Sequence, residues 1–206
     1  MWALVEDNTI TKIINQPRGM VIGDTQYSRN IFSFRWSNAE REAIGLYEIV
    51  FDNSKKKEEE FYINTNQTFT YDADAGTVTA TYGNATARAH ADVNATDADG
   101  NDLDPVIVIE GLKTKKIRNV KIQASSILTQ TDWYIVRKAD AGTAVPSAIT
   151  THRAAVRTKA AEMETAITNA ADTPALETLY TSVNTADEGD PVVMERPLGE
   201  LPTLES

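Results

Sequence analysis

The sequence predicts an α+β protein, in which an N-terminal antiparallel β module precedes a helical hairpin module and an extended C-terminal arm. Three observations predict this order. Short runs of alternating apolar and polar residues dominate residues 1–91, as in half-buried strands. Between residues 112 and 183, apolar residues recur at spacings of three, four and seven, as in amphipathic helices. Residues 184–206 contain three prolines and six acidic residues against one arginine, which is too polar a composition for a core.

The β module is predicted from two hairpins and one strand between them. The alternating runs Trp2–Glu6 and Thr9–Asn15 flank a two-residue Asp-Asn turn. The runs Gln67–Tyr71 and Val78–Tyr82 flank the sequence Asp-Ala-Asp-Ala-Gly. Such turn residues between alternating strands are typical of β-hairpins. The apolar run Tyr47–Phe51 indicates a buried strand.

A short helix is expected within this module. Ser37 and Glu40 match the capping box, in which the serine hydroxyl accepts from the backbone of the third helical residue while the glutamate reaches back. Gly45 tolerates the left-handed conformation that often ends a helix. The sequence therefore predicts about two helical turns between Ser37 and Gly45.

Residues 92–111 are predicted to form a polar linker with a short strand. Alternate acidic or amide residues in it resemble the first, third and fifth ligands of a calcium loop, but Gly100 stands one position too early and Val108 occupies the twelfth position. Two interpretations stay open: a polar hinge, and a non-EF-hand calcium site in a receptor- or carbohydrate-binding protein. The residues of that candidate calcium site would be Asp97, Asp99, Asn101, Asp102 and Asp104.

The helical module is predicted from three apolar patterns. Residues 113–128 and 147–169 each carry an apolar stripe, and a third, shorter helix is indicated by Thr173 as N-cap and Pro174 at the first helical position. The two stripes consist of Ile117, Val120, Ala124, Ile127 and Leu128, and of Ile149, Val156, Ala160, Met163 and Ile167.

Charge is unevenly distributed along the chain. The net charge is −10, which argues against nucleic-acid binding over the whole surface. Residues 112–160 nevertheless contain ten basic residues and only two acidic ones. An acidic chain with one basic module suggests docking by charge complementarity. No apolar run is long enough to span a membrane, and the lack of cysteine excludes disulfides and thiolate metal sites.

Residue patterns for catalysis are missing from the sequence. The two histidines, His90 and His152, are far apart and are expected at the surface or in interfaces. There is no Gly-x-Ser-x-Gly elbow, no Gly-rich phosphate loop and no His-Glu-x-x-His sequence. The sequence therefore predicts a protein that is not an enzyme, with no catalytic or cofactor-binding residues.

One stretch has a more specific pattern. Leu128 is followed by Thr131-Asp132-Trp133, then by the loop residues Asp140-Ala141, and then by a helix with Arg153 and Arg157. This succession, over about residues 115–160, resembles the C-terminal module of bacteriophage tail-assembly and tail-fibre-assembly proteins. The chain departs from that family at His152, where an aromatic residue is common, and at 134–137, which is more strand-like.

The resemblance implies a structural protein of the phage virion: a tail adaptor, or a subunit associated with the fibre or baseplate. Its partners would be other phage tail or fibre proteins, with self-association into a homo-oligomer in the tail. The alternative is a tail-fibre assembly chaperone that does not stay in the virion. The residues expected to bind partners are Asp132, Trp133, Tyr134, Arg153 and Arg157.

These five residues also have a simpler structural interpretation. Trp133 offers a large apolar area that could seal the helix pair. Arg153 and Arg157 lie one turn apart, so they share a helix face. They could bind a carboxylate-rich partner, close back on Asp132, or form a solvated face.

Overall fold

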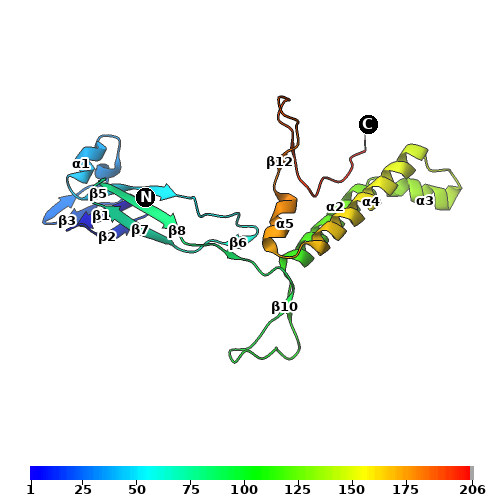
Figure 1. Ribbon diagram of the computed structural model, residues 1–206, viewed down its shortest axis with the longest axis horizontal. Helices are drawn as coiled ribbons and strands as arrows, with labels where there is room; N and C mark the ends of the chain where they lie inside the picture. The colour runs from blue at the N-terminus through cyan, green and yellow to red at the C-terminus, as the bar shows by residue number, and fades with distance from the viewer. Residues whose placement is uncertain (205–206) are drawn as a thin grey trace. The chain divides into compact units, whose positions relative to one another are not determined.

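The computed structural model describes residues 1–204 and confirms the α+β class (Figure 1). The chain divides into two compact units, Met1–Thr86 and Ala87–Ser206. The first unit contains the predicted β module up to residue 86, and the second contains residues 87–91 of that module together with the predicted linker, helices and arm. Within the described residues, no helix has the length and apolarity needed to cross a membrane.

The first unit is built on a five-stranded sheet of order β2-β1-β5-β8-β7. Both predicted hairpins are present as β1–β2 and β7–β8. At the first turn, Asp7 and Asn8 both have positive φ, as this tight connection requires. The strands are β1 (Trp2–Glu6), β2 (Thr9–Ile14), β5 (Leu46–Asp52), β7 (Gln67–Asp72) and β8 (Thr77–Tyr82).

One strand pair differs from the expected antiparallel arrangement. β5 and β8 are parallel, with Ile49 opposite Val78 and Asp52 opposite Thr81. The chain leaves β5, passes through β7 and returns in β8, which lies between them. Two parallel neighbouring strands need such a long connection. Hairpin patterns in the sequence identify only strands that follow each other directly, so they cannot indicate this parallel pair. The sheet is therefore mixed.

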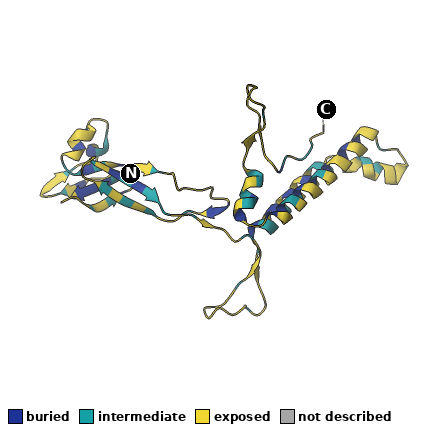
Figure 2. Ribbon diagram, viewed as in Figure 1, coloured by how far each residue is buried: buried dark blue, intermediate teal, exposed yellow. Residues whose placement is uncertain are grey.

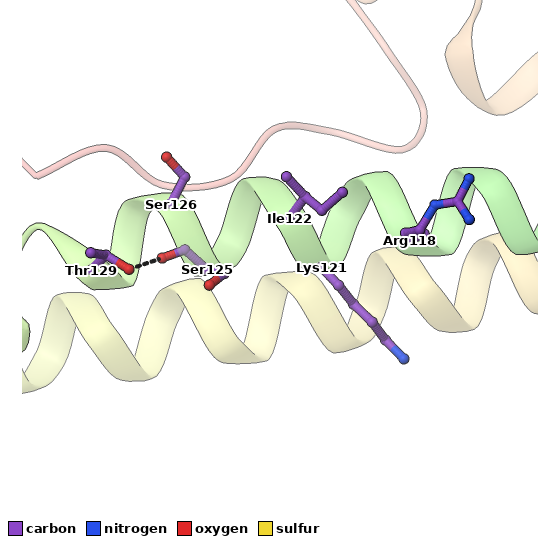
Figure 3. A pocket seen from close by; sticks show the side chains of 6 residues that line it. All are labelled: Arg118, Lys121, Ile122, Ser125, Ser126 and Thr129. Carbon is purple, nitrogen blue, oxygen red and sulfur yellow. Dashed lines mark hydrogen bonds between the residues drawn. The ribbon is translucent and has the colours of Figure 1, made fainter.

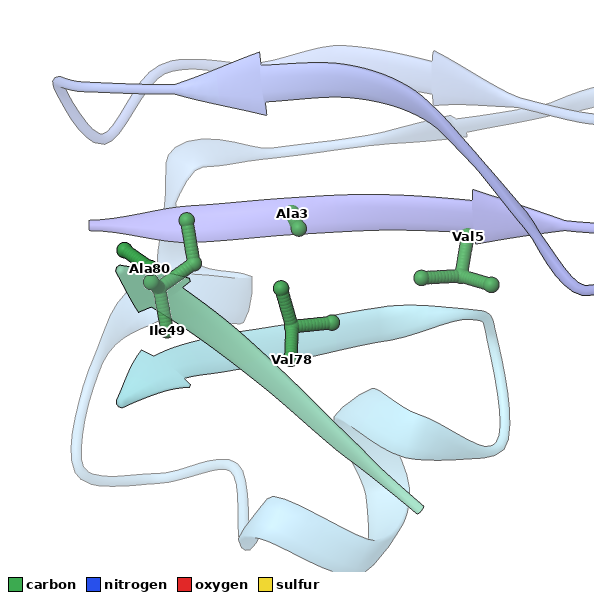
Figure 4. Close-up of a cluster of buried hydrophobic side chains, with 5 residues drawn as sticks. All are labelled: Ala3, Val5, Ile49, Val78 and Ala80. Atoms are coloured by element: carbon green, nitrogen blue, oxygen red, sulfur yellow. The ribbon is translucent and has the colours of Figure 1, made fainter. Parts of the chain in front are cut away.

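Apolar residues cover both faces of this sheet. On one face lie Ala3, Val5, Ile49, Val78 and Ala80, which Figure 4 shows gathered between neighbouring strands. The edge strands β2 and β7 contact each other, so the sheet curls. Leu4 and Leu46 belong to the cluster on the opposite face. Successive side chains of β1 thus point to opposite faces of the sheet and contribute to two separate cores.

The second face is covered by short elements. They are β3 (Met20–Ile22), β4 (Thr25–Tyr27), the 3-10 helix η1 (Arg29–Phe32) and α1 (Asn38–Glu42). The predicted capping box precedes α1: the Ser37 hydroxyl accepts from the Glu40 backbone, and the Glu40 carboxylate accepts from the Ser37 backbone at 2.7 Å. Arg41 is buried and donates to the carbonyl oxygens of Ile31 and Ser33.

A further two-stranded sheet consists of β6 (Tyr62–Ile63) and β9 (Thr86–Ala87).

The second unit contains the predicted helices. α2 (Leu112–Thr129) and α4 (Ser147–Asn169) pack side by side as a helical hairpin, joined through α3 (Asp132–Ala141). In Figure 2 a buried stripe runs along the line where α2 and α4 face each other, while their outer faces are exposed. The buried stripe contains Leu112, Val120, Ala124, Ile149, Val156, Ala160, Met163 and Ile167.

The last helix is α5 (Thr173–Tyr180). Its N-cap is Asp172, whose side chain accepts from the backbone of Ala175 at 2.8 Å, so the predicted cap at Thr173 is wrong by one position. The Thr173 hydroxyl instead donates to the carbonyl oxygen of Arg88, and the residue is buried. That bond joins the start of α5 to the segment that precedes α2.

The predicted linker and arm are both more structured than expected. Residues 92–111 include the hairpin of β10 (Val93–Asn94) and β11 (Val108–Ile109). The arm contributes to a second hairpin, of β12 (Val183–Asn184) and β13 (Met194–Glu195). After it, Leu198 is buried and its backbone donates to the carbonyl oxygen of Leu179 at 3.0 Å.

Candidate functional site

The residues of the phage-like pattern meet where α2 ends and α3 begins. Arg153 of α4 is buried, and its Nη1 donates to the carbonyl oxygen of Leu128 and to Oγ1 of Thr131, both at 2.6 Å. Its Nη2 lies 2.8 Å from Oδ1 of Asp132. One guanidinium therefore contacts three residues of the turn, Leu128, Thr131 and Asp132, and the fold brings Asp132 and Arg153 together.

Thr131 is the centre of this junction. It is buried, and its hydroxyl donates to the carbonyl oxygen of Leu128 while it accepts from Arg153. The last carbonyl groups of a helix lack partners within the helix, and here side chains supply them. The Thr-Asp step thus ends α2 and sets the direction of α3, which is a structural role.

α3 presents an apolar surface to solvent. None of its residues is buried, and Trp133 is 51 % exposed. The Trp133 and Tyr134 rings lie 3.8 Å apart, with the Arg137 guanidinium over both. Ile135 and Val136 are exposed as well. The expectation that Trp133 seals the helix pair is wrong, because the tryptophan lies on the outside.

The same helix corrects the strand-like interpretation of residues 134–137. These residues belong to α3, which ends at Gly142 with φ 69°. Thr131 and Arg153 fix the start of the helix, and the glycine permits the left-handed end. These two boundaries override the strand preference of the β-branched pair Ile135-Val136.

The two predicted arginines have different surroundings. Arg157 is exposed, and its Nη1 donates to the carbonyl oxygen of Arg153 at 3.4 Å. Arg153 is buried in the junction. Of the five residues predicted to bind partners, Asp132, Trp133 and Arg157 are exposed and Tyr134 is half-buried, whereas Arg153 is buried.

The two histidines, expected at the surface or in interfaces, are both withdrawn from the surface. His152 is buried in α4, and its Nε2 has no hydrogen-bond partner within residues 1–204. His90 is half-buried, and its Nε2 lies 2.9 Å from the carbonyl oxygen of Ala170. His90 thus joins the segment before α2 to the end of α4.

The candidate calcium residues form a loop held by its own hydrogen bonds. The Asp97 carboxylate accepts from the backbones of Asp99 and Asn101, and these bonds, that of Asn101 first, lower the pKa of Asp97. Asp102 accepts from the side chain of Asn94 at 2.6 Å. Among the described residues, no three acidic or histidine side chains lie together in a group that could hold a metal ion. Asp97 therefore shapes the tip of the β10–β11 hairpin.

A shallow groove lies on the outer face of α2 (Figure 3). The exposed side chain of Ile122 lies beside Lys121 on this face, and Arg118 lies one turn away along α2. Arg118 pairs with Glu110, and Lys121 lies 3.5 Å from Glu164 of α4. Both cations are thus engaged with acids of the same unit, so the groove is an ordinary helix surface.

Sequence reasoning missed the exposed apolar strands of the two small hairpins. Residues 106–109 and 192–194 are exposed aliphatic runs, and each follows the sequence Asp-Pro. Both runs are preceded by Val-Asn, at 93–94 and at 183–184. This repeat of Val-Asn and Asp-Pro is the sequence signal that could have indicated the two hairpins. Acidic loops of different lengths separate its two parts, so it is hard to recognise.

Comparisons with protein-family models, with curated proteins and with solved structures found no match to this chain.

Proposed function

We propose that this protein is a structural protein of a bacteriophage virion: a tail adaptor, or a subunit associated with the fibre or baseplate. It is not an enzyme, and it binds neighbouring tail proteins. The observation that carries the proposal is the phage-like pattern around Thr131-Asp132-Trp133, whose residues make one junction with Arg153. The protein is made in the host cytoplasm and retained in the particle.

The surface of α3 supports a binding role. Trp133, Ile135 and Val136 are exposed on one short helix, with Tyr134 and Arg137 beside the indole. Aromatic and arginine side chains are enriched where proteins bind one another, and a few such residues often carry much of the binding energy. The Arg153 junction holds this helix in place, so its apolar surface is ready for a partner.

Quantitative mass spectrometry of purified particles tests the proposal. The phage that encodes the protein is grown, and the protein is counted against the major capsid and tail proteins. A stoichiometric number of copies per particle supports a structural subunit. Absence from mature particles, despite expression during infection, overturns it.

A matched pair of substitutions tests the α3 surface. Trp133→Ala removes the largest exposed side chain of α3, whereas Ile122→Ala removes an exposed apolar side chain of α2. The proposal expects that Trp133→Ala reduces incorporation into particles at least tenfold, which corresponds to about 1.4 kcal/mol. Ile122→Ala leaves incorporation unchanged. If both variants are incorporated equally well, the α3 surface does not contact the neighbouring tail protein.

The alternative function is a tail-fibre assembly chaperone that leaves before the particle matures. The observation that favours it is also the exposed surface of α3, since an apolar helix can cover a folding subunit for a limited time. Affinity isolation from infected cells separates the two functions. A complex with a fibre subunit in cells, together with absence from particles, supports the chaperone.

A further inference from the structure

The two small hairpins of the second unit are copies of one pattern. Residues 104–108 read Asp-Pro-Val-Ile-Val, and residues 190–194 read Asp-Pro-Val-Val-Met. Each of these strands pairs with a strand that contains Val-Asn, namely 93–94 and 183–184. The sequence likeness therefore covers both strands of each hairpin.

The strand pairing is equivalent in the two hairpins. Val93 lies opposite Ile109, as Val183 lies opposite Glu195, and Asn94 lies opposite Val108, as Asn184 lies opposite Met194. One further residue along, the backbone of Ala95 donates to Ile107 at 2.7 Å, and that of Thr185 donates to Val193 at 2.8 Å. The register of the two hairpins thus agrees residue by residue, although the two connecting loops differ in length.

Both hairpins leave hydrogen-bonding edges open. Each forms a two-stranded sheet of its own in the described chain. In an antiparallel pair, alternate residues turn their backbone groups away from the partner strand. The carbonyl groups of Ile107 and Val193 accept hydrogen bonds from the partner strand of their own hairpin. The backbone groups of the next residues, Val108 and Met194, therefore point to the open edge.

Exposed apolar residues run along both open edges, at 106–109 and at 192–194, and Glu195 ends β13. The side chains of Val106, Ile107, Val108 and Ile109 are each more than half exposed, and Val192 is 71 % exposed. Short two-stranded hairpins are marginally stable in water, and the unpaired N–H and C=O groups of an exposed edge strand are a template for another strand. These strands therefore have the features of strands that lie inside a larger sheet.

We infer that the β11 edge of one copy pairs with the β13 edge of a second copy of this chain. A second copy is the occupant that the repeat favours, because every molecule carries both edges in the same register. Each copy would then use β11 toward one neighbour and β13 toward the other. Such a head-to-tail contact closes into a ring or continues as a chain.

Charge determines the direction of the pairing. The β10–β11 loop carries four aspartates, at 97, 99, 102 and 104, and the β12–β13 loop carries acids at 187, 188 and 190. Parallel pairing would bring the two acidic tips to the same end, where like charges repel. Antiparallel pairing of β11 with β13 puts the two acidic loops at opposite ends of the paired strands. It also places the two aliphatic runs, 106–109 and 192–194, side by side. The inference does not depend on the phage assignment.

The test uses full-length protein and the mass in solution measured by light scattering. Val108→Pro and Met194→Pro each remove one outward N–H group, which an edge strand tolerates without loss of its inner ladder. Val108→Thr and Met194→Thr keep that N–H and serve as controls. The wild type is expected to form oligomers, whereas each proline variant alone keeps only one of the two complementary edges and is expected to be monomeric. Circular dichroism checks that the helices of each variant are intact.

The mixing experiment identifies the two edges. Each proline variant keeps the edge that the other has lost, so an equimolar mixture is expected to form dimers, two copies of a 22.6 kDa chain. Hydrogen exchange is expected to show protection of the amides at 108 and 194 in the wild-type oligomer. A monomeric wild type overturns the inference. So does an oligomer that Val108→Pro disrupts and Met194→Pro leaves intact, since that result means β11 pairs with β11.

Discussion

The guanidinium of Arg153 lies 2.8 Å from the carboxylate of Asp132 and joins α4 to the first residue of α3. The Arg153 side chain is 9 % exposed, whereas that of Asp132 is 53 % exposed. Water screens the carboxylate, so the ion pair itself contributes little to stability. The two bonds of Arg153 to Leu128 and Thr131 are sheltered, and they make the larger contribution.

Arg153→Met is expected to lower the free energy of unfolding by about 2–3 kcal/mol, because hydrogen bonds to a charged group are lost and Thr131 loses its donor. Asp132→Asn is expected to cost less than about 1 kcal/mol, since that carboxylate is exposed. Arg157→Met serves as the control and is expected to be near neutral. Denaturant unfolding measures all three. Equal effects of Arg153→Met and Arg157→Met would contradict the assigned roles.

The capping box of α1 gives a prediction about acid. The backbone of Ser37, then its hydroxyl, donates to Glu40 and lowers the pKa of that carboxyl. A carboxyl with a lowered pKa in the folded state contributes stability that is present above its ordinary pKa and lost as pH falls through the lowered value. Ser37→Ala is expected to cost about 1 kcal/mol at neutral pH.

Glu40→Gln is the matched variant, since the amide oxygen can still accept from Ser37. It is expected to remove this part of the pH dependence while retaining most of the stability. Thermal unfolding between neutral pH and pH 3 measures both variants, with the range set by ordinary carboxyl pKa values. An unchanged acid slope in Glu40→Gln would show that other carboxyl groups dominate.

Two glycines with positive φ are expected to respond differently to alanine. A Cβ at Gly45, where φ is 79°, would collide with the carbonyl oxygen of Val5. Gly76 has φ 62° and open space around it. Gly76→Ala is therefore expected to cost about 1–2 kcal/mol from backbone strain alone. Gly45→Ala is expected to cost more, because backbone must also move. Chemical denaturation of the two variants provides the comparison, and similar losses would argue against the close approach.

The paired tyrosines of the first unit predict a response to alkali. The hydroxyl groups of Tyr47 and Tyr71 lie 3.1 Å apart in a hydrogen bond, which together with burial raises the pKa of Tyr47 to about 12. A raised pKa favours the neutral form in the folded state. Its stabilisation is present below the ordinary tyrosine pKa of about 10 and is lost as pH rises toward 12.

Tyr71→Phe removes the hydrogen bond and is expected to bring the ionisation of Tyr47 closer to the ordinary range. Ultraviolet titration of wild type, Tyr71→Phe and Tyr47→Phe isolates the contribution of Tyr47 by difference. The control is Tyr82→Phe, a change outside this pair. If Tyr47 ionises at the same pH with and without the Tyr71 hydroxyl, the hydrogen bond does not determine its pKa.

Local signals predicted much of the fold. Ser37 and Glu40 form the expected cap, and the Asp7-Asn8 turn joins the expected strands, because these features depend on neighbours in sequence. The stripes of α2 and α4 follow helical periodicity in the same way. The candidate site was predicted in part: Asp132 and Arg153 meet, but the exposure of Trp133 depends on how a whole helix is oriented.

Distant pairings escaped the sequence analysis. The parallel contact of Ile49 with Val78 joins strands separated by a hairpin, and no local pattern indicates it. The β10–β11 and β12–β13 hairpins were read as linker and arm because their acidic loops dominate the composition. Their strands become visible only when residues 104–108 are compared with residues 190–194.

The position of β8 between β5 and β7 affects how the first unit folds during synthesis. β8 is the last strand of the five-stranded sheet to be made, yet it lies between β5 and β7. Until residue 82 has left the ribosome, the edge of β5 stays unpaired, and a nascent chain with such an edge is prone to aggregate. The β7–β8 hairpin can form locally and then dock as a unit, so the sheet closes in one late step.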